Sequence, residues 1–204
     1  MGMRSVTRFA VVAALGLSAF GISVFAAPPV PRPAKELEIV EPNGKHDLLT
    51  SYRGKVVLVQ FLYTTCPHCQ AYSQLLSKIQ KEYGPKGFQA LGVAFNDADN
   101  GMVANYIAQN KVNFPIGPAL RDTVLSFMGF SMMDQVYVPQ IALVDKKGQI
   151  REQSEPKPVT EGLQNEAHLR SMIDKLLAEG PGASSGGANS GKAAPPPATK
   201  KPTS

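Results

Sequence analysis

The sequence contains no tryptophan and only two cysteines in 204 residues. Both cysteines stand in one short motif, Cys66-Pro67-His68-Cys69. A disulfide between them would close a very short loop and would constrain the unfolded chain little, so a purely structural role is a weak interpretation. A structural zinc site needs about four ligands, and beyond the cysteines the chain has only three histidines. We therefore expect a redox centre in this motif and no metal.

A charge excess of one sign is absent from the central part of the chain. The formal net charge is +5, but five basic residues lie near the ends, at Arg4, Arg8, Lys192, Lys200 and Lys201. Residues 27–179 are left with 16 Lys and Arg against 16 Asp and Glu. A folded region that is formally neutral offers no broad basic surface for phosphate groups, so we expect no nucleic-acid partner.

Long apolar runs are also scarce, and the one run that could cross a membrane lies at the N-terminus. Residues 1–26 combine Arg4 and Arg8 with an apolar stretch and a small-residue site, which predicts a signal peptide cleaved after Ala26. An uncleaved membrane tether is the alternative, because the run approaches the roughly 20 residues of a membrane span. Disulfide chemistry persists in oxidising compartments, so the leader predicts a periplasmic or secreted protein.

Segments of low complexity flank the expected domain. Residues 27–35 are rich in proline, which predicts an extended spacer. Residues 180–204 contain no large apolar side chain. Such a tail cannot bury enough surface to offset the entropy of ordering, so we expect it to be disordered. The remaining residues, 36–179, have the length and apolar content of one domain.

The pattern of apolar residues within 36–179 predicts alternating strands and helices. Buried strands are expected at 55–63 and 88–95, where apolar residues follow one another without alternation. The other expected elements are an N-terminal extension at 36–50, helices from the motif to Gly84, at 100–110, at 119–128 and at 165–179, and a hairpin turning at 146–148. The order strand, helix, strand, helix favours parallel pairing of the two strands and an α/β fold.

Three features of the motif's surroundings coincide with those of one family. The motif follows a buried strand, opens a helix, and is followed downstream by Val138-Pro139 at the head of another apolar strand. The ordered segments RGKVVLVQFLYTTCPHC, FPIG and YVPQIALVDKKGQI resemble the thioredoxin superfamily, and within it the exported TlpA/ResA-type and redoxin branch, over residues 36–178. The resemblance implies a thioredoxin-like α/β fold, with a central mixed sheet and helices on both faces. It also implies that Pro139 is cis and lies against the cysteines.

The position of the motif gives its residues separate roles. At the start of a helix, Cys66 faces unpaired backbone N–H groups and the positive end of the helix dipole, which favour a thiolate. We therefore expect Cys66 to be the attacking nucleophile and Cys69, one turn further in, to resolve the mixed disulfide. His68, which follows Pro67, would tune the reduction potential by donating a hydrogen bond to the Cys66 sulfur.

These roles predict thiol–disulfide exchange with protein substrates and with a redox partner protein. Val138 and Pro139 would shape the groove that accepts an extended substrate strand. No dissociable cofactor is needed, because the cysteine pair carries the two electrons. The direction of electron flow stays open, since the Pro-His pair resembles that of the periplasmic disulfide oxidases, whereas the TlpA/ResA branch contains reductants that serve cytochrome assembly.

Three positions depart from the pattern of this family. Thr65 replaces the usual tryptophan before the first cysteine. Gln60 stands where thioredoxins carry a buried acid that assists proton transfer, and Tyr72 replaces the glutamate that the cytochrome-assembly reductants use near the second cysteine. These departures argue against an efficient reductase.

Two other functions are the alternatives. The motif loosely resembles the thioredoxin-fold copper chaperones of cytochrome oxidase, but those proteins place three residues between their cysteines. A peroxiredoxin-like peroxidase would have threonine at the position of Tyr63 and proline at that of Val59. Met128, Met132 and Met133 are soft groups that could bind copper, but we expect them to pack in the core or line the groove.

Overall fold

The computed structural model describes residues 27–157 and 162–180. The predicted signal peptide at 1–26 and the predicted disordered tail beyond Gly180 lie outside the described residues. In the part of the chain that is described, no helix is long and apolar enough to cross a membrane.

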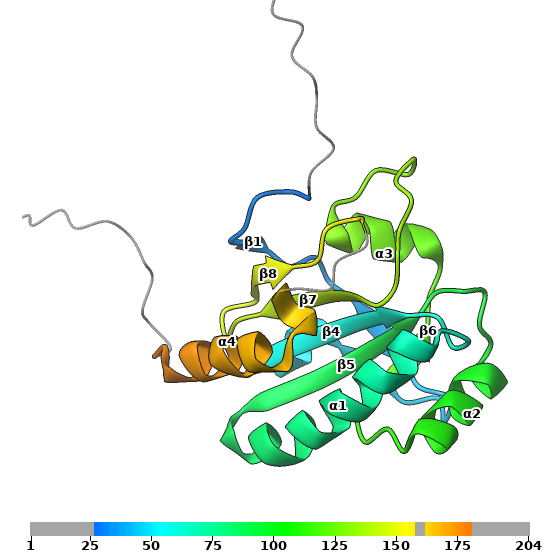
Figure 1. Ribbon diagram of the computed structural model, residues 1–204, viewed down its shortest axis with the longest axis horizontal. Coiled ribbons are helices and arrows are strands. Elements are labelled where there is room, and N and C mark those ends of the chain that lie inside the picture. The colour runs from blue at the N-terminus through cyan, green and yellow to red at the C-terminus, as the bar shows by residue number, and fades with distance from the viewer. Residues whose placement is uncertain (1–26, 158–161, 181–204) are drawn as a thin grey trace, which may run out of the picture.

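A six-stranded mixed sheet forms the centre of the molecule (Figure 1). Its middle strand β4 (Val56–Leu62) is parallel to β5 (Phe88–Ala94) and antiparallel to β7 (Gln140–Val144). All of β4 is buried, as expected for a strand covered on both faces. The outer strands are β6 (Ile116–Pro118) beyond β5, and β8 (Gln149–Gln153) and β1 (Arg32–Pro33) beyond β7.

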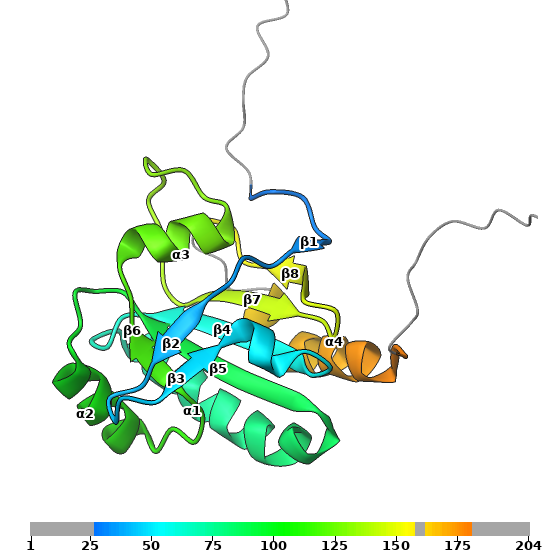
Figure 2. The ribbon, with the colours of Figure 1, turned by 180° about the vertical axis from the view of Figure 1, so that it is seen from behind.

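Helices cover both faces of this sheet, which confirms the predicted thioredoxin-like architecture. One face packs against α1 (Pro67–Tyr83), α2 (Asn100–Asn110) and α4 (Glu166–Ala178) (Figure 1). The opposite face, which Figure 2 shows from behind, packs against α3 (Arg121–Met128) and a separate hairpin. This hairpin consists of β2 (Glu38–Val40) and β3 (His46–Leu48). The chain also forms three short 3-10 helices among the described residues, which are η1 (Leu49–Tyr52), η2 (Gly84–Lys86) and η3 (Gly162–Gln164).

The predicted elements lie close to those observed. The register of β4 with β5, in which Val56 lies opposite Phe88, confirms the predicted parallel pairing. The predicted hairpin is β7–β8, and Gly148 in its turn has a φ of 76°, in the left-handed region that favours glycine. The helix expected at 119–128 begins later, at Arg121, because Leu120 is still extended.

The proline-rich segment at 27–35 includes an edge strand of the sheet. Arg32–Pro33 pairs antiparallel with β8, a position where proline is tolerated because one side of the strand is unpaired. Arg32 Nη2 donates to the carbonyl oxygen of Phe127 at 2.9 Å and to Gln153 Oε1 at 2.6 Å. The central sheet therefore reaches into the segment assigned to the spacer.

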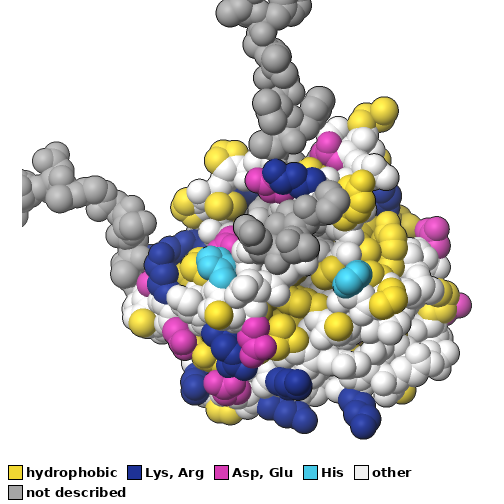
Figure 3. Space-filling model, in the orientation of Figure 1, with side chains coloured by type: hydrophobic (Ala, Val, Ile, Leu, Met, Phe, Trp, Pro, Cys, Tyr) yellow, Lys and Arg dark blue, Asp and Glu magenta, His cyan; other side chains and the backbone are white. Residues whose placement is uncertain are grey.

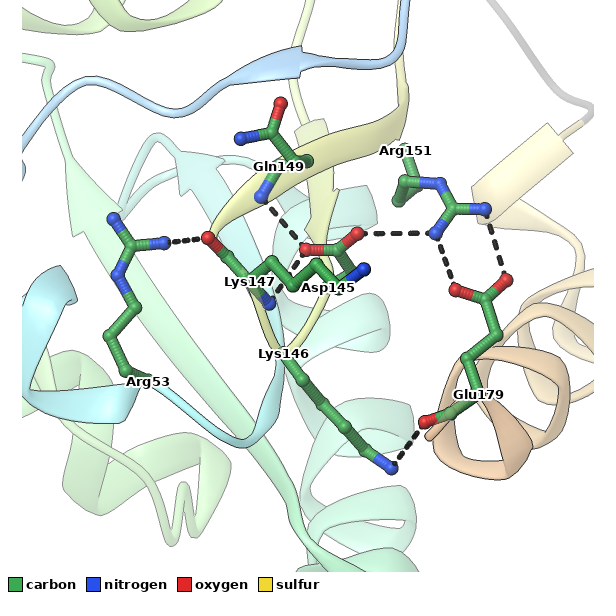
Figure 4. Close-up of polar contacts among 7 residues, drawn as sticks. All are labelled: Arg53, Asp145, Lys146, Lys147, Gln149, Arg151 and Glu179. Carbon is green, nitrogen blue, oxygen red and sulfur yellow. Dashed lines mark hydrogen bonds and ion pairs between the residues drawn. The ribbon is translucent and has the colours of Figure 1, made fainter. Parts of the chain in front are cut away.

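A cluster of ion pairs and hydrogen bonds links the C-terminal end of α4 to the β7–β8 hairpin (Figure 4). Arg151 donates to Glu179 Oε2 at 2.6 Å and Oε1 at 3.0 Å, and to Asp145 Oδ2 at 3.1 Å. Lys146 Nζ donates to the carbonyl oxygens of Leu177 and Glu179, at the negative end of the helix dipole. Because Val144 pairs with Val57, this cluster lies at the end of the sheet where β4 begins.

Candidate active site

Cys66 caps the N-terminus of α1 at the opposite end of β4. Its backbone is extended (φ −85°, ψ 117°), and Pro67 takes the first helical position. The backbone N–H of Cys69 donates to Cys66 Sγ at 3.4 Å, which is the contact that a serine or aspartate N-cap normally makes. A helix amide that points at sulfur at the positive end of the dipole favours negative charge on that sulfur.

The two sulfur atoms differ in their access to solvent. Both cysteines are free thiols, with Cys66 partly exposed and Cys69 buried at 0% exposure. Burial raises the pKa of the Cys69 thiol, and its hydrogen bond with Cys66 raises that pKa further. Of the two sulfur atoms, that of Cys66 is therefore the more accessible, and Cys69 lies beneath it as a protonated thiol.

The loop before β7 lies against the outer sulfur. The Val138–Pro139 peptide bond is cis, as the resemblance implied. Cys66 Sγ lies 3.9 Å from the carbonyl oxygen of Val138. Gln140 holds this loop in place, since its Nε2 donates to the carbonyl oxygens of Tyr137 at 2.6 Å and Glu155 at 3.1 Å. The structure therefore brings both predicted groove residues to the motif.

His68 and Pro67 are exposed beside the cysteines. Within the described residues, no hydrogen bond joins the His68 ring to Cys66. The ring instead lines a shallow hollow, together with Ala71, Tyr72, Leu75, Pro139 and Gln164. Figure 3 shows hydrophobic side chains gathered on this face of the molecule, with Lys and Arg along its lower edge. The influence of His68 on the reduction potential stays a prediction.

Hydrogen bonds from a residue that follows β5 hold the loop between β4 and α1 in position. Asn96, two residues after the end of β5, accepts from the backbone N–H of Thr64 at 3.1 Å and donates to Thr64 Oγ1 at 3.0 Å. Gln70 Nε2 adds a hydrogen bond to the Thr64 carbonyl at 3.3 Å. Because Thr64 is two residues before Cys66, these contacts help to hold the backbone of Cys66 in position.

The three departures from the family pattern have different structural consequences. Thr65 is exposed, so no bulky side chain covers Cys66 from that position. Tyr72 is buried and donates to the carbonyl oxygen of Leu163 at 2.7 Å, so it ties α1 to η3. Gln60 is buried at 0% exposure and donates to the carbonyl oxygen of Cys69 at 3.0 Å. The position expected to affect proton transfer thus touches Cys69 with a neutral amide.

The residues that would support copper binding do not gather at the cysteines. His46 Nδ1 lies 2.7 Å from Glu38, and His168 Nε2 lies 2.8 Å from Glu152. Across residues 27–157 and 162–180, no group of three or more His, Cys, Asp or Glu side chains could hold a metal ion. Of the methionines, Met128 is buried as expected, whereas Met132 and Met133 do not pack in the core, since they are 57% and 91% exposed.

Several residues of the site were not found from the sequence. Asn96 had a usable signal, because a polar residue after β5 must lie at the same sheet edge as the residues that follow its parallel neighbour β4. Gln140, Ser73 and Tyr106 had none, because each lies in an apolar or helical pattern and acquires its partner only through packing between elements.

The chain is similar to several known proteins. The family model for Redoxin matches residues 29–173. Thiol-disulfide oxidoreductase ResA of Geobacillus thermodenitrificans is 26% identical over 151 residues, which cover 73% of this chain and 83% of that protein. Probable glutathione peroxidase 8-A of Xenopus laevis is 34% identical over only 59 residues, 29% of this chain and 28% of that protein.

Solved structures share the fold. The crystal structure of a thiol:disulfide interchange protein of the thioredoxin family from Chlorobium tepidum TLS matches with a TM-score of 0.62 at 24% identity. The match covers 74% of this chain and 100% of that chain. At this level of identity the likeness confirms the thioredoxin-like fold.

Proposed function

Because the chain belongs to the Redoxin family and is a thiol-disulfide oxidoreductase of the thioredoxin superfamily, we propose that it exchanges disulfides with exported protein substrates through Cys66 and Cys69. The observation that carries this proposal is that an accessible sulfur at the N-cap of α1 lies beside a buried sulfur. The Cys69 N–H points at Cys66 Sγ at 3.4 Å, and Cys69 itself is at 0% exposure. In the proposed reaction, Cys66 attacks and Cys69 resolves.

The reaction has two steps and needs no further electron carrier. Written as reduction of a substrate, Cys66 sulfur attacks a substrate disulfide, and one substrate sulfur leaves as a thiol. The bond formed is a mixed disulfide between Cys66 and the other substrate sulfur. Cys69 sulfur then attacks Cys66, so that the substrate leaves fully reduced and the pair becomes a disulfide. The reverse sequence oxidises a substrate dithiol.

The Val138–Pro139 loop would orient the substrate. The carbonyl oxygen of Val138 is 3.9 Å from Cys66 Sγ, so a substrate strand beside it would bring its sulfur close to the nucleophile. The hollow along His68, Leu75 and Pro139 would receive an adjacent apolar side chain. Backbone pairing beside a shallow pocket suits protein substrates of varied sequence.

Cysteine variants test this function directly. With insulin as the disulfide substrate and dithiothreitol as the electron source, Cys66→Ser should abolish catalysed reduction. Cys69→Ser should accumulate a mixed disulfide between Cys66 and the substrate, which non-reducing electrophoresis and mass spectrometry detect. Full activity in Cys66→Ser would overturn the proposal, because only the buried Cys69 would remain in that variant.

The direction of electron flow is tested by the reduction potential of the pair. We propose that His68 stabilises the reduced form and makes the disulfide more oxidising, so His68→Ala should lower the potential. Equilibration in glutathione and dithiothreitol buffers, followed by mass tagging of free thiols, measures it. A potential that is strongly reducing and unchanged in His68→Ala would instead favour a reductase of the kind that serves cytochrome assembly.

We also propose that the protein works outside the cytoplasm, in the periplasm or after secretion. The proposal rests on the sequence of residues 1–26 and on the need of disulfide chemistry for an oxidising compartment. N-terminal sequencing of the expressed protein should find Ala27 as the first residue. Retention of residues 1–26 in a membrane fraction would favour a tethered form.

A further inference from the structure

A chain of hydrogen bonds runs behind the resolving cysteine and joins three elements. Gln60 on β4 donates through Nε2 to the Cys69 carbonyl at 3.0 Å. Ser73 on α1 lies one turn after Cys69, and its hydroxyl donates to Gln60 Oε1 at 2.7 Å. Tyr106 on α2 completes the chain, with its hydroxyl 2.7 Å from Ser73 Oγ.

The direction of every hydrogen bond in this chain is determined. Gln60 Oε1 can only accept, so the single proton of the Ser73 hydroxyl is used for that bond. The Tyr106 hydroxyl must therefore donate to Ser73 Oγ. Because Oε1 is held by Ser73, the amide N–H of Gln60 is turned toward Cys69. Gln60 and Ser73 are at 0% exposure and Tyr106 is at 2%, so water does not compete for these groups.

The groups of the chain stay uncharged across the physiological pH range. Neither an amide nor a serine hydroxyl titrates in water, and burial raises the pKa of Tyr106 above its ordinary value. The titratable groups that face Cys69 are Cys66, before α1, and Tyr106, from α2. From β4, the neutral Gln60 contacts Cys69. From the loop before β7, the neutral Val138 contacts Cys66. His68, on the first turn of α1, is exposed. Within the described residues, the immediate surroundings of Cys69 thus contain no buried carboxylate.

We propose that Ser73 and Tyr106 are positioning residues, which hold the Gln60 amide against Cys69 so that the resolving step proceeds without a buried base. This role rests on the proposed thiol–disulfide exchange at Cys66 and Cys69. It concerns the second step of that exchange, in which Cys69 attacks the mixed disulfide. In that step the Cys69 S–H bond breaks, and its electron pair forms the bond to Cys66 Sγ. The bond from Cys66 to the substrate sulfur breaks, and the proton of Cys69 passes to the departing thiolate. Charge and electrons balance without another group.

Single-turnover kinetics with oxidised glutathione separate the two steps. The reduced protein is mixed with the probe and quenched in acid at set times, and mass spectrometry follows the Cys66–glutathione adduct and the internal disulfide. Ser73→Ala leaves Gln60 Oε1 unpaired and the amide free to turn. Losing one buried hydrogen bond should slow decay of the adduct by about fivefold, while its formation at Cys66 keeps its rate.

Two further variants distinguish positioning from general loss of packing. Gln60→Glu keeps the shape but adds a titratable group, so the pH profile of adduct decay should gain a second ionisation that the unmodified protein lacks. Tyr106→Phe leaves the bond from Ser73 to Gln60 intact and should slow decay by less than Ser73→Ala does. Tyr83→Phe is the matched control, since it removes a tyrosine hydroxyl contact to Asp174 at the far end of α1 and should change neither step.

The outcomes separate this inference from the function on which it rests. If oxidised glutathione forms no adduct at Cys66 in the unmodified protein, the proposed exchange reaction is wrong. If the adduct forms and decays, but Ser73→Ala and Gln60→Glu leave the decay rate and its pH profile unchanged, the positioning role is wrong and the exchange reaction stands. Ser73→Ala and Tyr106→Phe remove different hydroxyls, so a folding defect in one leaves the other informative.

Discussion

The carbonyl oxygen of Val138 lies 3.9 Å from Cys66 Sγ, although the two residues are 72 positions apart in the chain. The antiparallel pairing of β7 with β4 produces this approach, because Gln140 at the start of β7 lies opposite Phe61 near the end of β4. The loop before β7 and the loop after β4 therefore meet at one edge of the sheet. The partly exposed sulfur of Cys66 therefore lies beside the backbone of Val138, which is itself partly buried.

Gln140→Leu should weaken the use of protein substrates more than the chemistry of Cys66. The Gln140 amide holds the carbonyl oxygens of Tyr137 and Glu155, and leucine would leave both without that donor. We expect the catalytic efficiency with insulin to fall several-fold and the reaction with oxidised glutathione to keep its rate. The free energy of unfolding should fall by about 1–3 kcal/mol. An equal loss with both substrates would contradict a role in orienting the loop.

Asn96→Ala should release the loop that carries Cys66. Asn96 makes reciprocal hydrogen bonds with the backbone N–H and the hydroxyl of Thr64, so its removal should lower the free energy of unfolding by about 1–2 kcal/mol. Formation of the Cys66–glutathione adduct should slow as well. Asn96→Asp keeps the acceptor for the Thr64 N–H and loses only the donor. Its stability and its rate of adduct formation should therefore lie between those of the unmodified protein and Asn96→Ala. Urea denaturation and quenched-flow kinetics measure both effects.

At pH 7, Cys66 should react with iodoacetamide much faster than Cys69. Burial raises the pKa of Cys69, so its thiol keeps the proton in the neutral range, and alkylation requires the thiolate. One unit of pKa corresponds to about a tenfold difference in thiolate population near neutral pH, so Cys69 should be slower by at least about that factor. Mass spectrometry of the reduced protein should show a species modified at Cys66 alone. A lone Cys69 in Cys66→Ser that reacted as fast as free cysteine would refute this.

Arg151→Ala should destabilise the protein at pH 7 and less so in acid. Arg151 makes two charge-assisted hydrogen bonds to Glu179 and one to Asp145 (Figure 4), worth about 2 kcal/mol together for partly buried groups. The bond to Arg151 lowers the pKa of Glu179. The resulting stability is present above the unfolded pKa, about 4.3, and is lost as the pH falls through the lower folded pKa.

Urea denaturation of both proteins at pH 7 and pH 3 measures this difference. Arg151→Lys is the control, because it keeps the positive charge and loses the paired geometry, so it should recover only part of the stability. Since the cluster lies at the end of the sheet away from Cys66, adduct formation at Cys66 should stay unchanged in both variants. A destabilisation that is independent of pH would mean that packing of the side chain, rather than its ion pairs, matters.

The sequence alone determined the fold class, the buried strands and the reactive motif. The mostly apolar runs predicted β4 and β5, because a strand covered on both faces carries apolar residues at nearly every position. The spacing of the cysteines and the helix that follows them predicted that Cys66 would stand at a helix N-terminus, where it is found. These are local properties, set by residues within a few positions of one another.

Only the tertiary structure decided which distant groups meet at that motif. Gln60, Ser73 and Tyr106 come from β4, α1 and α2, and their hydrogen bonds exist because those elements pack on one face of the sheet. The same packing buries Cys69 and leaves Cys66 accessible, although both belong to one short motif. Burial and the choice of hydrogen-bond partner depend on elements far apart in the chain, so local sequence patterns do not carry them.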